Sequence, residues 1–172
     1  HTQRRRQRQM CIRDSCDVNH PIIYNKMGNS ICINKANFNP PFIENLFLIY
    51  LGKKQNTQTS IANYSKSQFN KVESIKKINR ICDEFLKCND LIHFEELVQE
   101  HESIISKAIS INPIQKSTFI GYKDGKIKSL GSWGGDFILV TTKNKDLTYF
   151  RNRGLNTIIP VSYTHLRAHE TV

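Results

Sequence analysis

Residues 127–139 read Ile127-Lys128-Ser129-Leu130-Gly131-Ser132-Trp133-Gly134-Gly135-Asp136-Phe137-Ile138-Leu139. The two apolar runs predict strands over residues 126–130 and 136–142, joined by a connection with three glycines in five positions. Glycine lets backbone N–H groups approach an anion or another loop because no Cβ intervenes. The pattern therefore fits either a loop beside an anion or a structural hairpin loop.

Upstream of this stretch, residues 46–51 are apolar on both faces, which is typical of a buried strand. Apolar residues at intervals of three and four then predict two helices. The first follows a capping-box pattern, Ser65-x-x-Gln68, and the second is capped by Asn89. Their predicted inward stripes are Phe69, Val72, Ile75, Ile78, Cys82 and Phe85 in the first helix, and Leu91, Phe94, Leu97, Val98, His101, Ile104, Ile105 and Ala108 in the second.

Downstream, residues 146–153 predict a short helix ended by Gly154, and residues 157–160 predict a last strand. From residue 46 onward the order is strand, helices, strand, strand, helix, strand. This order predicts an α+β fold: a ferredoxin-like (split βαβ) antiparallel sheet with helices on one face, plus a long helical hairpin. A β-hairpin is predicted over residues 21–35, around Gly28 and Asn29.

The two ends of the chain differ from its centre. Their six basic residues are all Arg, whereas the centre has 16 Lys and three Arg. Residues 1–15 and 161–172 resemble translated sequencing-adapter sequence, so both are interpreted as non-native tails without a part in the fold. The alternative for residues 1–15 is a basic arm that binds nucleic acid. The remaining chain divides into residues 16–45, which would link to a preceding domain, and a domain over residues 46–160.

Composition limits the classes of protein. The chain has 172 residues, a net charge of +10 and an apolar share of 38%, enough for the core of one domain. Its longest apolar run, residues 46–51, is far shorter than the ~20 residues that span a bilayer. We therefore expect a cytoplasmic protein that has no membrane partner. The five cysteines show neither zinc-site spacing nor a Cys-x-x-Cys pair, so no disulfide or metal site is predicted.

Residues 128–135 resemble the third conserved motif of the GHMP kinases, Lys-x-Thr/Ser-Gly-Ala-Gly-x-Gly-Gly before a strand. Residues 50–64, 125–139 and 149–160 are similar to stretches of a bacteroidete subgroup, the GYDIA-family GHMP kinases, so the resemblance covers most of residues 20–160. Trp133 and Asp136 depart from the general family pattern, and both are typical of the subgroup.

The resemblance implies the C-terminal domain of an ATP-dependent kinase that transfers a phosphoryl group to a small metabolite. The full-length enzyme would use ATP and Mg²⁺. The family's ATP-binding motif, Pro-x-x-x-Gly-Leu-x-Ser-Ser-Ala, belongs to the N-terminal domain and has no counterpart in this sequence. We therefore expect a fragment that is inactive alone, binds no cofactor and has a missing N-terminal kinase domain as its partner. Its catalytic residues stay unknown.

The resemblance and the glycine pattern nominate one set of site residues. The connection would support the phosphate loop of the N-terminal domain and lie near the substrate through Gly131, Ser132, Trp133, Gly134, Gly135 and Asp136. Asp136 would either cap the N–H groups of the connection or contact the substrate, and Trp133 would pack against the partner domain or cover the site. Lys53 and Lys54 would contact a phosphate or form a solvated strand end.

Other residues allow other interpretations. His93, Glu96 and Glu100 share a helix face and suggest either a metal site or, as we favour, a solvated polar face. His101 is interpreted as a boundary histidine rather than a ligand. The alternative function is a small basic module that binds nucleic acid or another anion. It is disfavoured because the predicted strands 126–130 and 136–142 carry only one aromatic residue, Phe137, for stacking on bases.

Overall fold

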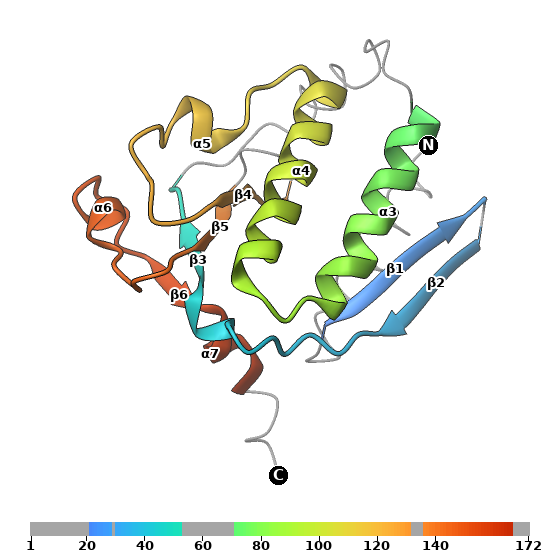
Figure 1. Ribbon diagram of the computed structural model, residues 1–172, viewed down its shortest axis with the longest axis horizontal. Coiled ribbons are helices and arrows are strands. Elements are labelled where there is room, and N and C mark those ends of the chain that lie inside the picture. Colours follow the sequence, from blue (N-terminus) through green and yellow to red (C-terminus); the bar gives the residue numbers. More distant parts are fainter. Residues whose placement is uncertain (1–20, 29, 53–70, 132–135, 167–172) are drawn as a thin grey trace. The chain divides into compact units, whose positions relative to one another are not determined.

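The computed structural model in Figure 1 describes residues 21–28, 30–52, 71–131 and 136–166. Two compact units divide the chain: residues 1–39 with 162–172, and residues 40–161. The elements in chain order are β1 (Ile22–Met27), β2 (Ser30–Lys35), η1 (Ile43–Asn45), β3 (Leu46–Tyr50), α3 (Lys71–Lys87), α4 (Leu91–Ile109), α5 (Ile114–Ser117), β4 (Ile127–Ser129), β5 (Phe137–Thr141), α6 (Thr148–Arg151), β6 (Ile158–Pro160) and α7 (Val161–Leu166).

The first unit contains the predicted hairpin. Strands β1 and β2 pair antiparallel, with Tyr24 opposite Ile33 and Met27 opposite Ser30. Gly28 in the turn has φ +58°, a conformation that glycine adopts without steric cost. The prediction of a hairpin is therefore confirmed, and its strands extend further toward the turn than the two apolar runs do.

The second unit is built on a four-stranded sheet with the order β4-β5-β3-β6 (Figure 1). Every neighbouring pair is antiparallel. All four strands lie within the ranges that the sequence predicts. The fold is α+β, with antiparallel sheets and a helical hairpin. Its central strands are the most apolar ones, and Ile49, Ile138 and Val140 are fully buried.

The register divides the side chains of the sheet between two faces. Phe47, Val140 and Ile127 share one face, where the side chains of Phe119, Tyr122 and Phe150 complete a core. Thr141 and Lys128 lie on the opposite face, and both contact residues of α4. The prediction of helices on one face is therefore wrong. Helix α4 covers one face, whereas α6 and the segment around α5 cover the other, because the loops after α4 and β5 carry aromatic side chains back onto the sheet.

Helices α3 and α4 form the predicted hairpin, but the inward stripe of α3 differs from the prediction. Ile81 is fully buried, whereas Val72 and Ile75 are 67% and 55% exposed and Cys82 is also exposed. The stripe prediction assumed that one face packs along the whole helix. Contacts with α4 come from the later part of α3, where Arg80 pairs with Glu100, Glu84 with His93 and Phe85 with Phe94.

The start of α4 is set by Asp90 rather than by the predicted Asn89. The Asp90 carboxylate accepts a hydrogen bond from the backbone N–H of His93 at 2.8 Å, which satisfies one of the free N–H groups at the helix start. Seven residues of α4 are buried: Phe94, Glu95, Leu97, Val98, Glu102, Ala108 and Ile109. His101, Ile104 and Ile105, also on the predicted stripe, are only partly buried.

The segment over residues 161–172 was predicted to take no part in the fold. The structure instead begins α7 at Val161, whose exposed fraction is only 9%. Val161 directly follows β6, so the folded region continues past residue 160. Residues 1–20 and 167–172 lie outside the described residues. None of the described helices is both long enough and apolar enough to cross a membrane.

Candidate functional site

The glycine-rich connection runs from the end of β4 to the start of β5. The backbone N–H of Leu130 donates to the Phe137 carbonyl at 3.2 Å, so the two strands stay paired where the connection begins. Gly131 follows with φ +67° and with no atom within 4 Å of an added Cβ. Asp136 is exposed at the other side of the connection. The site candidates Ser132, Trp133, Gly134 and Gly135 lie outside the described residues.

The end of β3 lies beside this connection. The Leu51 N–H donates to the Asp136 carbonyl at 2.8 Å, and the Tyr50 and Phe137 rings lie 5.1 Å apart. Gly52 turns the chain away with φ +69°. Lys53 and Lys54 come next in the sequence and lie outside the described residues. The structure thus brings the chain before Lys53 next to Asp136, although the two stretches are more than 80 positions apart in the sequence.

A buried polar cluster lies on the opposite side of β4 from the aromatic core. The Lys128 ammonium is 3.2 Å from His101 Nδ1, 3.7 Å from Glu102 Oε1 and 3.4 Å from the Ser129 carbonyl. The side chains of Lys128, His101 and Glu102 are only 18%, 15% and 3% exposed. Lys and Glu side chains are rarely buried without partners, so the contacts within this cluster account for the burial of Lys128 and Glu102.

Burial sets the protonation states in this cluster. It lowers the pKa of His101 to about 4, with a further contribution from the Lys128 charge. His101 is therefore neutral at pH 7, and its Nδ1 can accept a hydrogen bond from Lys128. Burial also lowers the pKa of Lys128, while the Glu102 carboxylate opposes that shift. The cluster thus places a lysine, a carboxyl group and a neutral imidazole side by side, and all three side chains are mostly buried.

A second polar network lies at the other end of β5, and no sequence pattern indicates it. The Thr141 hydroxyl donates to the buried Glu95 carboxylate at 2.5 Å and accepts from the Lys126 N–H at 2.8 Å. The Tyr122 hydroxyl donates to the Thr141 carbonyl at 2.5 Å, and burial raises the Tyr122 pKa. The Thr142 hydroxyl donates to Asp124. This network stabilises the turn before β4.

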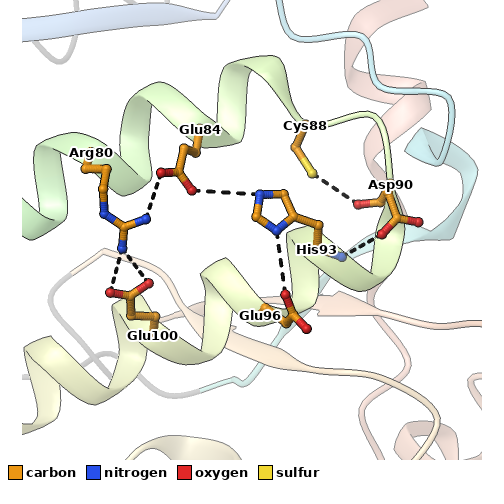
Figure 2. Close-up of polar contacts among 7 residues, drawn as sticks. All are labelled: Arg80, Glu84, Cys88, Asp90, His93, Glu96 and Glu100. Carbon is orange, nitrogen blue, oxygen red and sulfur yellow. Dashed lines mark hydrogen bonds and ion pairs between the residues drawn. The ribbon is translucent and has the colours of Figure 1, made fainter.

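The polar residues of the helical hairpin connect its two helices rather than binding solvent alone (Figure 2). Arg80 of α3 contacts both carboxylate oxygens of Glu100 at 2.7 Å and one oxygen of Glu84 at 2.7 Å. His93 lies 3.8 Å from Glu84 and 3.6 Å from Glu96. His93, Glu96 and Glu100 lie on one helix face because each of them pairs with a charged neighbour there. Within the described part of the chain, no group of three or more His, Cys, Asp or Glu side chains could hold a metal.

No protein-family model and no curated protein sequence matches the chain. Among solved structures, the fold is similar to the crystal structure of a Lin0012 protein from Listeria innocua, with a TM-score of 0.50 and 14% sequence identity. The alignment covers 80% of this chain and 39% of that one. The chain thus spans about two fifths of the length of the protein that it matches, and at this identity the likeness shows the fold alone.

Proposed function

We propose that this chain is the C-terminal domain of a GHMP-type kinase, which transfers a phosphoryl group from ATP to a hydroxyl or phosphate of a small metabolite. One observation carries the proposal. The three stretches that resemble the family, residues 50–64, 125–139 and 149–160, have described parts that meet around the end of β3. The Leu51 N–H donates to the Asp136 carbonyl at 2.8 Å, and the Tyr50 N–H donates to the Thr157 carbonyl at 3.0 Å.

The sheet order supports the ferredoxin-like part of the proposal. Strands β3 and β4 are both antiparallel to β5, which lies between them, so they run in the same direction. The helical hairpin connects them in sequence. A parallel pair of strands joined through helices and separated by an inserted strand is the arrangement of a split βαβ unit.

The proposed role of the connection is to support the phosphate-binding loop of the N-terminal domain. Phosphoryl transfer depends mainly on positioning and on stabilising the charge of the transferred group and its Mg²⁺. The nucleotide and Mg²⁺ would bind chiefly to a companion N-terminal domain. Here, Gly131, Gly134 and Gly135 would let the backbone lie close to that domain, and Asp136, Lys53 and Lys54 would lie near the substrate.

The alternative function, a nucleic-acid-binding sheet, has less support. Such sheets stack bases on aromatic side chains of an open face. In the second unit, the aromatic core covers one face of the sheet and α4 contacts the other.

The experiment uses the full-length kinase that the proposal implies, recovered from the gene that encodes residues 16–160. Gly134→Ala and Gly135→Ala should each lower kcat/KM by at least ~10-fold, about 1.4 kcal/mol of transition-state stabilisation. Gly154→Ala is the control, because it lies after α6, far along the chain from the connection, at φ +77° with open space around an added Cβ. Full activity in both variants of the connection would show that it is only a turn. An upstream sequence without a glycine- and serine-rich ATP-binding motif would contradict the kinase assignment.

A further inference from the structure

Strand β4, which leads into the glycine-rich connection, has few main-chain hydrogen bonds. It has three residues, Ile127–Ser129, and lies at the edge of the sheet, paired only with β5. Its last described main-chain hydrogen bond to β5 runs from the Leu130 N–H to the Phe137 carbonyl at 3.2 Å. On the other edge of β4, the Ile127 N–H donates to Gln115 Oε1 at 3.0 Å. A short edge strand held there only at its first residue should fray readily at its other end, Ser129 and Leu130.

The Lys128 side chain supplies a second attachment on the free side of this strand end. Its ammonium contacts the Ser129 carbonyl, one residue before Leu130, and reaches His101 and Glu102 of α4 at 3.2 and 3.7 Å. The neutral imidazole accepts without adding a second cation, and the carboxylate balances the charge. The same ammonium group therefore joins the backbone at the end of β4 to a long helix.

We propose that Lys128 is a positioning residue, which fixes the start of the glycine-rich connection by tying the end of β4 to Glu102 and His101 of α4. Only the role of the connection in catalysis rests on the proposed function. The tie itself stands on the distances and burial of the described residues. Lys128 thus acts through the backbone of Ser129 and Leu130 and does not touch the reacting groups.

Amide hydrogen exchange in the full 172-residue chain tests this inference without nucleotide or substrate. In Lys128→Met, the Leu130 amide should exchange at least 10-fold faster than in the unsubstituted protein. The Thr141 amide should keep its rate, because it donates to the Lys126 carbonyl at 2.9 Å at the other end of the same strand pair. Lys126→Met, one residue before β4, is the control for loss of a lysine beside the strand, and it should change neither amide.

A double variant separates positioning from general stabilisation. Lys128→Met leaves the Glu102 carboxylate without this cation, whereas Lys128→Met combined with Glu102→Leu removes both charges and restores an apolar contact. The proposal expects fast exchange at Leu130 to persist in the double variant, with the wild-type rate at Thr141. Equal acceleration of both amides in Lys128→Met, reversed in the double variant, would overturn the proposal, as would an unchanged Leu130 rate in Lys128→Met. Because the assay needs no activity, a failure of the kinase proposal would leave its result intact.

Discussion

The substitution Gly125→Ala tests how closely the turn before β4 packs against β5. An added Cβ would lie 2.1 Å from the Thr141 carbonyl oxygen and 2.5 Å from Thr141 Oγ1. Both atoms already have partners, since the carbonyl accepts from Tyr122 and the hydroxyl donates to Glu95. The methyl group therefore has no space unless the turn or the strand moves.

The expected size of the effect follows from these contacts. Overpacking costs about 1–3 kcal/mol, and one lost buried hydrogen bond costs about 1–3 kcal/mol. We expect the free energy of unfolding to fall by about 3 kcal/mol, which for a chain of this size lowers Tm by roughly 6–12 °C. Thermal unfolding followed by circular dichroism measures this shift.

The test depends on the sign of the change in the free energy of unfolding. Gly125 does not adopt a positive φ, so without the collision alanine should stabilise the chain by about 0.4–1 kcal/mol through the unfolded state. Gly154→Ala is the control for backbone strain alone, at about 1–2 kcal/mol, because its Cβ would meet nothing within 4 Å. An unchanged or raised Tm in Gly125→Ala would refute the close packing.

Two further predictions concern pH and the chain end. The folded-state pKa of His101, about 4, lies below the ordinary value of 6.5, so the unfolded chain binds the proton more readily and stability is lost as pH falls from 6.5 to 4. Across this window, urea titrations should show that the wild type loses about 2 kcal/mol more than His101→Gln, after allowance for partial solvent screening; parallel curves would contradict the buried, neutral state. Deleting residues 1–15 should leave Tm within error, and a loss above ~2 kcal/mol, the scale of a lost core contact, would show that this stretch is part of the fold.

The sequence was sufficient to predict the strands because their apolar runs are short, strongly biased and bounded by turn residues. Leu46 and Ile49 are buried, as a run that is apolar on both faces predicts. The α+β class, the antiparallel pairing and the helical hairpin also agree with the prediction. The covering of the sheet could not be predicted in the same way, because Phe119 and Phe150 belong to loops and a very short helix with no periodicity to read.

The helical hairpin shows where periodicity stops being informative. Val72 and Ile75 have the spacing of an inward stripe, yet both are exposed. Periodicity identifies which residues share a helix face, but not how far along its length that face meets a partner. The choice between Asn89 and Asp90 as the cap was equally open, since both side chains can accept the hydrogen bond.

The polar residues of the candidate site were the hardest to predict. Glu95 and Glu102 are charged residues on a helix, which are normally exposed, and only their tertiary partners explain their burial. Lys128 was noticed as part of a motif, but its contact with His101 crosses 27 positions of sequence. The one available signal was the position of His101 within an apolar stripe, which suggested a boundary residue rather than an acceptor for a buried lysine.

Calorimetric titration with Mg-ATP tests the central proposal most directly, because it locates the nucleotide site. The 172-residue chain should show no binding in the micromolar range, since none of the described segments combines a phosphate-cradling loop with a following helix N-terminus. The extended protein, encoded by the full gene that contains residues 16–160, should bind Mg-ATP with micromolar affinity. Micromolar binding by the 172-residue chain alone, or its absence from the extended protein, would contradict the assignment of this chain as the C-terminal domain of a kinase.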